Sequence, residues 1–378
     1  MKYLFFIAAF NAIFFAFLIL QKKAKALHDK ILFYWLFYLG FFIAAYALSS
    51  HELFHRIHYF LNFIISMFLL HGPFLYLYVD ALSTEKKKIY KKDLLHFIPF
   101  VFFVFYLIIS LFIPGYAEKI RIDHVEIPVK PPVIFIIFLL IAAFSGPVYF
   151  VLSVRKIKAI KNTILNNYST TEYINPDWLK ALVTIFGVIW TALITIAVIH
   201  HVFHYFTIDF CINGLFLSLS AFVILVGYYG LRQKEIFTNF SSEPQDIVNI
   251  PKAHQAHNPL KETETSESVS KINRIMKEEK PYLNPDLTLP ELAASLKIPA
   301  YQLSRIINEQ YECNFFEFIN GFRVNEVKEK IRNPQWDHLS LLGIAFESGF
   351  NSKSAFNRVF KKTTGFTPSE YKSSLSSS

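Results

Sequence analysis

Long apolar runs alternate with short polar segments through the first 235 residues of the chain. Each run is close to the ~20 residues that a helix needs to cross roughly 30 Å of hydrocarbon. Seven runs can be marked, at 3–20, 31–50, 57–79, 94–113, 132–153, 179–203 and 210–231. Tyr, Trp, Lys and His residues flank them, which is typical of the border between hydrocarbon and water. The pattern predicts a seven-helix transmembrane bundle over residues 1–235, with the lipid bilayer as a partner.

The basic residues of the intervening loops indicate how the bundle is oriented. Loops 21–30, 80–93 and 154–178 carry four, five and four Lys or Arg residues, whereas the loops between them carry one, three and none. Basic loops stay in the cytoplasm, so the N-terminus is expected outside and the chain after the seventh run inside. The expected location is the inner membrane of a bacterial cell, as a multi-pass protein. A cleaved signal peptide ending near Ala26 is the alternative, and the lysines after the first run argue against it.

The pattern changes after the last apolar run. Residues 236–270 are rich in Ser, Thr, Glu, Asn and Pro and poor in apolar residues. Such a segment buries too little apolar surface to offset its ordering entropy, so it is expected to be a flexible linker. A tether of about 30 residues has a root-mean-square span of roughly 30 Å. A short helix over 270–280 is expected either to dock on the following domain or to pair two chains.

Short amphipathic helices follow over residues 271–378, and the first pair has the form of a helix-turn-helix unit. Thr288 and Glu291 have the spacing of a capping box, which opens a helix over 290–296. A turn over 297–299 leads to a second helix over 300–311. Its outward face carries three side chains able to reach base edges or phosphates: Tyr301, Gln302 and Arg305.

A second helix-turn-helix unit is predicted further along. Ser340 caps a short helix over 341–347, and Gly349 lies in the turn, where a positive φ costs glycine little. Ser352 then caps a helix over 353–363. The outward face of that helix is polar and basic, as expected for a helix that enters a major groove: Lys353, Ser354, Asn357, Arg358 and Lys361.

Four motifs in this region occur in a characteristic order. They are Gly343-Ile344-Ala345, Ser348-Gly349-Phe350, the run from Ser354 to Lys362, and the run from Gly365 to Tyr371. Together they resemble the AraC/XylS-type DNA-binding domain over about 271–373. In that family two helix-turn-helix units, joined by a helix, place their recognition helices in successive turns of the major groove. The resemblance implies DNA contacts on both predicted outward faces and a mainly structural role for Arg323 on the joining helix.

The apolar half resembles the seven-span input regions of some bacterial membrane-tethered AraC-type regulators. The fold class expected is therefore all-α, a transmembrane bundle followed by a cytoplasmic domain with two helix-turn-helix units. The expected function is a membrane-anchored, sequence-specific transcription regulator that couples an unknown membrane or extracytoplasmic signal to promoter binding. The alternative is a membrane receptor or carrier whose tail docks a protein partner. Double-stranded DNA, a second copy of the chain and an unknown small ligand or ion are the expected partners.

Charge and histidine placement refine this picture. The net charge of +9 comes mainly from the membrane half, and residues 271–378 contribute only +3, so strong nonspecific DNA affinity is not expected. His51 with His55 and His200 with His204 are i,i+4 pairs at the expected outer ends of their helices. Each pair shares a helix face, so they could bind Zn²⁺ or titrate between pH 5 and 8. The alternative, which we favour, is that these histidines only populate a polar interface.

The sequence offers little support for catalysis or a structural metal. Cys211 and Cys313 lie in different segments and form neither a disulfide framework nor a zinc-ligand motif. A glycine-rich phosphate loop, a serine nucleophile elbow and paired carboxylates inside the apolar runs are all absent from the sequence. We therefore expect no enzyme activity and no cofactor.

Overall fold

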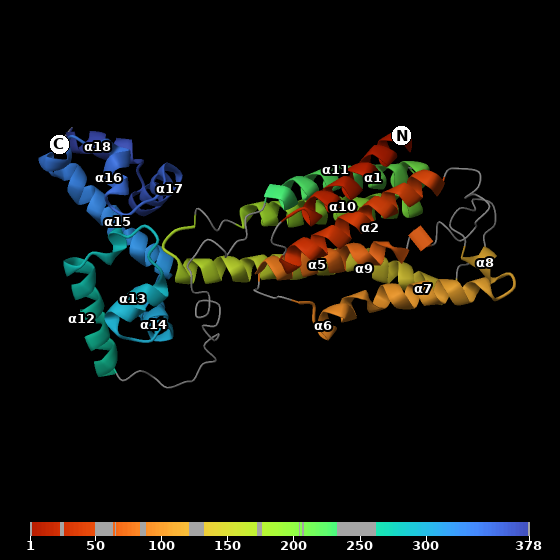
Figure 1. Ribbon diagram of the computed structural model, residues 1–378, viewed down its shortest axis with the longest axis horizontal. Helices are drawn as coiled ribbons and strands as arrows, with labels where there is room; N and C mark the ends of the chain where they lie inside the picture. The colour runs from red at the N-terminus through yellow and green to blue at the C-terminus, as the bar shows by residue number, and fades with distance from the viewer. Residues whose placement is uncertain are drawn as a thin grey trace. The chain divides into compact units, whose positions relative to one another are not determined.

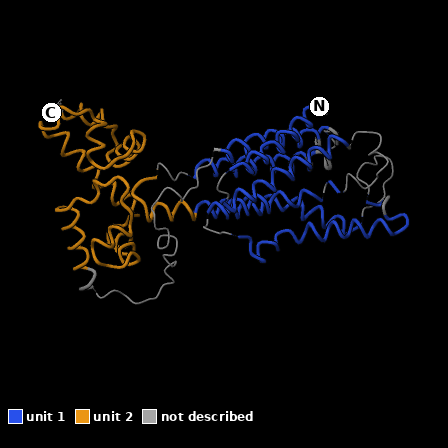
Figure 2. The backbone as a smooth tube through the Cα atoms, viewed as in Figure 1, with its two compact units in different colours: residues 1–158, 176–235 blue, residues 159–175, 236–378 orange. Residues whose placement is uncertain are grey.

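A computed structural model describes residues 2–22, 26–49, 63–64, 66–83, 88–120, 132–171, 176–203, 205, 208–232 and 262–376. Every regular element within these ranges is a helix. The chain forms two compact units, one from residues 1–158 and 176–235 and the other from residues 159–175 and 236–378 (Figure 2). Each unit is described below by itself.

The first unit is built from long apolar helices (Figure 1). Its elements are α1 (Lys2–Leu20), α2 (Leu27–Ser49), α5 (Phe68–Ser83), α6 (Lys91–Leu94), η1 (Leu95–Phe97), α7 (Ile98–Leu111), α8 (Tyr116–Lys119), α9 (Val133–Asn167), α10 (Asp177–Phe203) and α11 (Ile208–Arg232). Helix α9 belongs to this unit only as far as Lys158.

Six helical segments within the described residues are long and apolar enough to cross a membrane. They are Tyr3–Leu20, Leu27–Leu48, Lys91–Leu111, Val133–Asn167, Asp177–Ile196 and Asn213–Leu231. The third predicted run, 57–79, lies partly outside the described residues, and α5 covers its second half. The all-α fold class, with a bundle of long apolar helices before a second helical domain, is confirmed.

The outer surface of the bundle exposes many large apolar side chains. Trp35, Phe42 and Phe216 are fully buried in its core, whereas Phe10, Phe102 and Phe144 are each more than 60% exposed. A soluble protein rarely exposes apolar side chains on this scale. The outward aromatic surface therefore fits a bundle embedded in lipid.

Helices α9 and α10 approach closely where α9 contains a proline. Pro147 has no N–H to donate to the carbonyl of Ala143, one turn earlier. The indole Nε1 of Trp190 donates to that carbonyl instead, over 2.9 Å. The ring packs directly on Gly146, where a Cβ would lie 2.2 Å from it. In hydrocarbon a free carbonyl is costly, so this contact fixes how the two helices pack.

The second unit contains a series of shorter helices (Figure 1). They are α12 (Glu262–Glu278), η2 (Pro281–Leu283), α13 (Leu289–Leu296), α14 (Ala300–Gln310), α15 (Phe315–Arg332), η3 (Pro334–Trp336), α16 (Leu341–Phe346), α17 (Lys353–Thr364) and α18 (Pro368–Ser376). Helix α12 begins inside the range predicted as linker, so its first turns are helical rather than extended chain. The end of α9 and the residues that follow it, 159–171, also belong to this unit.

Helix α15 joins two small cores. Its first half, including Phe315 and Ile319, packs with α12, α13 and α14. Its second half, including Val324 and Val327, packs with α16 and α17. Each core supports one helix-turn-helix unit, and the shared helix connects them.

Candidate nucleic-acid interface

The first helix-turn-helix unit begins with the capping box predicted from the sequence. The backbone N–H of Thr288 donates to Glu291 Oε2 over 2.8 Å, and the N–H of Glu291 donates to Thr288 Oγ1 over 3.4 Å. This capping box opens α13 one residue before the predicted start. Lys297 ends α13 with a φ of 54°, and α14 begins at Ala300 as expected.

Helix α14 has a polar outward face and, on its opposite side, a buried apolar face. Leu303, Ile306 and Ile307 are buried. Tyr301 is 58% exposed, and Gln302 and Arg305 are partly exposed. The Nε of Arg305 donates to Glu309 Oε1 over 2.9 Å, one turn along the same face. An exposed pair of this kind contributes little stability, so a DNA phosphate can replace the carboxylate.

The turn of the second unit depends on a glycine. Ser340 accepts a hydrogen bond from the N–H of Gly343 over 3.1 Å and caps α16, as predicted. Gly349 has a φ of +89°, and a Cβ there would lie 2.3 Å from the carbonyl oxygen of Tyr282. Conformation and space both require glycine at this position. The turn is therefore held against the segment that precedes α13.

The recognition helix of the second unit, α17, presents the face predicted for it. Ser352 Oγ accepts from the N–H of Ala355 over 3.2 Å and caps the helix, and Gly365 ends it with a φ of 81°. Its buried side chains are Phe356, Val359 and Phe360. The five predicted contact residues all lie on the exposed side: Lys353, Ser354, Asn357, Arg358 and Lys361.

Arg323 lies inside the domain rather than on either outward face. It is 1% exposed, and its guanidinium donates to the carbonyls of Tyr282 and Asn284, each over 2.8 Å. Burial lowers the pKa of Arg323 to about 10, so the side chain stays charged at neutral pH. A buried cation of this kind is stable only while its donors are paired with acceptors. The contacts hold α15, the helix that joins the two helix-turn-helix units, against the η2 segment that precedes α13.

A second buried network supports the same joint. The hydroxyl of Tyr282 and the ammonium of Lys280 each donate to Glu326 Oε2 over 2.9 Å. Burial works to raise the pKa of Glu326, but these hydrogen bonds outweigh it, and the pKa lies below its ordinary value. Lys330 lies 3.5 Å from the same carboxylate and donates to the carbonyl of Glu347 at the end of α16.

One group of contacts was not foreseen from the sequence. Residues 154–178 were predicted to form a cytoplasmic loop, but α9 continues to Asn167, and residues 159–171 are part of the second unit. Ser169 is 1% exposed and bonds to Arg323. A signal was available, because Ile157, Ile160 and Ile164 continue a helical apolar spacing beyond the basic residues.

The histidine pairs stay a prediction. His51, His55 and His204 lie outside the described residues, and the side chain of His200 is likewise not described. Among the residues that the structure does describe, no three or more His, Cys, Asp or Glu side chains gather as metal ligands would.

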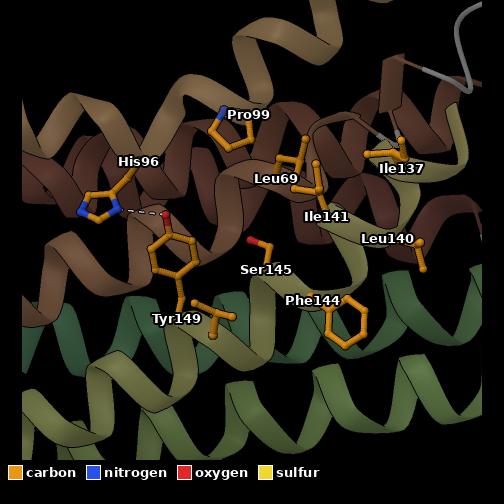
Figure 3. A pocket seen from close by; sticks show the side chains of 10 residues that line it. Leu69, His96, Pro99, Ile137, Leu140, Ile141, Phe144, Ser145 and Tyr149 are labelled. Atoms are coloured by element: carbon orange, nitrogen blue, oxygen red, sulfur yellow. Dashed lines mark hydrogen bonds between the residues drawn. The ribbon is translucent and has the colours of Figure 1, made fainter. Parts of the chain in front are cut away.

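The surface of the bundle has an open cavity of about 390 Å³ (Figure 3). It is lined mainly by apolar side chains of α5, α7 and α9, namely Leu69, Pro99, Ile137, Leu140, Ile141, Phe144 and Val148. Three polar side chains, His96, Ser145 and Tyr149, also line it. His96 Nδ1 and the Tyr149 hydroxyl are 3.0 Å apart. The lining suits a largely apolar molecule with one hydrogen-bonding group.

The geometry of residues 288–371 defines a domain with two helix-turn-helix units joined by one helix. The C-terminal region carries an AraC-type helix-turn-helix domain: residues 292–374 match the family model described as a helix-turn-helix domain. Over 106 residues the chain is 26% identical to the regulatory protein PocR of Salmonella typhimurium, a match that covers 28% of this chain and 34% of PocR. No solved structure shows a significant match.

Two further relatives are transcription regulators by name. The uncharacterized HTH-type transcriptional regulator SACOL0084 of Staphylococcus aureus is 25% identical over 134 residues, which is 35% of this chain and 17% of the relative. The probable transcription factor PqrA of Proteus vulgaris is 26% identical over 89 residues, 24% of this chain and 70% of the relative. The chain thus spans about a third of PocR and less of SACOL0084.

Proposed function

We propose that this protein is a membrane-anchored transcription regulator that binds promoter DNA with sequence preference. The observation that carries the proposal is the exposed polar and basic face of α17 over a capped, fully packed core. The match of residues 292–374 to the helix-turn-helix family model supports it, as does the similarity to a regulatory protein and a probable transcription factor. The apolar bundle on the same chain supplies the anchor.

DNA recognition would use one helix from each unit. In helix-turn-helix proteins the N-terminal part of the recognition helix contacts base edges in the major groove. Tyr301 and Gln302 occupy that part of α14, and Lys353 and Ser354 occupy it on α17. Arg358 is expected to pair with a guanine edge or a phosphate, the commonest partners of an exposed arginine at such an interface.

The bundle is the proposed input. We assign residues 1–235 to it, 236–270 to the linker with the start of α12, and 271–378 to the DNA-binding domain. The basic loops support a cytoplasmic position for the C-terminal domain in a bacterial cell, where it would meet the DNA. The cavity beside His96 and Tyr149 is the candidate site for an apolar signal molecule within the membrane.

The full chain can be tested in detergent micelles. It would be incubated with a library of random-sequence duplex DNA, and retained duplexes would be amplified and sequenced over several rounds. We expect one sequence family to be enriched. Replacing Arg358 with Ala should weaken binding to that family by about 5- to 150-fold, which corresponds to the ~1–3 kcal/mol of one base-reading contact.

A matched control distinguishes a specific contact from a general loss of charge. Arg274 is an exposed arginine on α12 and belongs to neither recognition helix. Arg274→Ala removes the same charge and should leave affinity within about twofold of the original chain. No enriched sequence, together with equal retention of both variants, would favour the alternative of a receptor whose tail docks another protein.

A further inference from the structure

A short polar segment that directly follows α9 is buried against the helix-turn-helix units. Tyr168, Ser169 and Thr170 follow directly after α9 and are 4%, 1% and 4% exposed. They belong to the second unit, together with α12 to α18. A polar loop between two transmembrane helices would ordinarily face water, so burial of these residues requires specific partners. We name residues 168–171 the docking segment.

The docking segment begins by pairing with the backbone that leads into α13. Tyr168 and Thr288 form an isolated antiparallel β-bridge. The N–H of Ser169 donates to the carbonyl of Leu287 over 3.2 Å, and its hydroxyl donates to the carbonyl of Pro285 over 3.3 Å. The segment is thus fixed in register against the start of the first helix-turn-helix unit.

Ser169 also supplies acceptors to the buried face of α15. Its carbonyl accepts from Asn320 Nδ2 and from Arg323 Nη1, each over 3.0 Å. Its hydroxyl accepts from Arg323 Nη2 over 3.0 Å. One residue of the docking segment therefore provides two of the oxygens around a buried guanidinium. If the segment undocked, Asn320 Nδ2 and the Arg323 guanidinium would have to donate to water instead.

The end of the docking segment reaches the second helix-turn-helix unit. Asn351 Nδ2 donates to Thr170 Oγ1 over 3.0 Å, just before the Ser352 cap of α17. Arg358 Nη2 donates to Thr171 Oγ1 over 3.2 Å. The segment thus bonds to a residue at the N-terminal end of the recognition helix and to an arginine expected to contact DNA.

We propose that the docking segment and DNA compete for this surface, so that the protein binds DNA only when residues 168–171 are released. The proposal rests on the proposed function, because it concerns the same recognition helix. A phosphate would bind Arg358 through charge-assisted hydrogen bonds, roughly twice as strong as the bond to a threonine hydroxyl. DNA therefore displaces Thr171 unless the remaining docking contacts hold the segment in place.

The chain connectivity gives the membrane half control of the docking segment. Helix α9 lines the bundle cavity with Ile137, Ile141 and Tyr149. Near its other end, Lys156 forms a 2.6 Å ion pair with Asp80 of α5. The same helix then continues to Asn167 and passes directly into the docking segment. A signal that shifts α9 would move the docking segment without involving residues 236–270.

The variants that test the proposal change the docking segment and leave the residues of the DNA-binding face unchanged. Ser169→Lys places a second cation beside Arg323, so the docking segment is expelled. Thr163→Lys is the matched control, because it adds the same charge on the exposed side of α9. A double variant, Thr170→Ala with Thr171→Ala, removes only the side-chain bonds to Asn351 and Arg358. It tests the competition without disturbing the surroundings of Arg323.

Binding of the full-length variants in micelles would be measured against the duplex enriched by the selection described above. If nine-tenths of the chains are docked, release raises the apparent affinity about 10-fold for Ser169→Lys. The double variant should bind at least threefold tighter, and Thr163→Lys should match the original chain. Hydrogen–deuterium exchange should show residues 168–171 protected in the free protein and exposed once the duplex is added.

The outcomes distinguish the two proposals. Suppose that both docking variants bind the duplex no more tightly than the original chain, and that residues 168–171 stay protected in the DNA complex. The segment would then be a structural part of the domain, and the proposed competition with DNA would be wrong. The proposed function would stand in that case. If neither the original chain nor any variant retains a preferred duplex, DNA recognition itself fails, and exchange in the free protein still reports whether docking occurs.

Discussion

Replacing Gly349 with Ala should selectively destabilise the second helix-turn-helix unit. The residue has a φ of +89°, and the added Cβ would lie 2.3 Å from the carbonyl oxygen of Tyr282 and 3.0 Å from Arg323 Nε. That carbonyl is also an acceptor for the buried guanidinium of Arg323. Relieving the clash therefore moves backbone and weakens a hydrogen bond that the buried charge requires.

The loss of stability expected for Gly349→Ala is the sum of two separate costs. A left-handed backbone costs an alanine about 1–2 kcal/mol. Overpacking against a fixed neighbour costs about 1–3 kcal/mol more. The sum is roughly 2–5 kcal/mol, and even its lower limit corresponds to an opening equilibrium shifted about 30-fold.

Hydrogen–deuterium exchange of the full chain in micelles measures the loss of stability helix by helix. Amides of α16 and α17 should exchange about 30-fold faster or more in Gly349→Ala, while those of α13 change less. The matched control is Gly321→Ala, because a Cβ at that helical position meets nothing within 4 Å. Alanine there should slow exchange in α15, since it improves helix propensity by about 1 kcal/mol. Unchanged protection in Gly349→Ala, or equal losses in both variants, would refute the reasoning.

Three further outcomes are expected. Thr288→Ala removes the side-chain cap of α13 and should cost about 1 kcal/mol, seen as roughly fivefold faster exchange in α13 that Thr288→Ser reverses. Because the folded-state pKa of Glu326 lies below its ordinary 4.5, its contribution to stability is present above that value and lost as pH falls below it. Thermal unfolding between pH 7 and 4 should therefore show a loss below about pH 4.5 that Glu326→Gln abolishes. For DNA, Lys353→Ala or Lys361→Ala should each lower the slope of log affinity against log salt by about 1, if that lysine contacts a phosphate. An unchanged slope would exclude that contact.

Local patterns were sufficient to predict most individual helices of the second unit. The Thr288–Glu291 capping box and the Ser340 and Ser352 caps all start helices within one residue of the predicted position. A cap and an amphipathic face involve side chains only three or four residues apart. Such features can be read along the chain without knowing its path, and they also placed the exposed side chains of α17 correctly.

The end of α9 shows where this reasoning stopped short. The basic residues after Val154 predict the end of a membrane span, but they do not end the helix. At 1.5 Å per residue, a helix of 35 residues is roughly 50 Å long, well beyond the hydrocarbon thickness. The apolar spacing of Ile157, Ile160 and Ile164 carried that information, and a prediction based on charge alone did not use it.

The sequence by itself determined the helices, their caps, the apolar bundle and the outward face of the recognition helix, because each depends on neighbours within one or two turns. Only the tertiary structure decided what surrounds Arg323. Its partners include Ser169, 154 residues away along the chain, and Arg358 meets Thr171 at a separation of 187. A serine or threonine in the sequence shows that a side chain can form hydrogen bonds, but it does not show with which partner. Which acceptor reaches a buried cation depends on the path of the whole chain, and that path brought residues 168–171, which follow α9, to the helix-turn-helix domain.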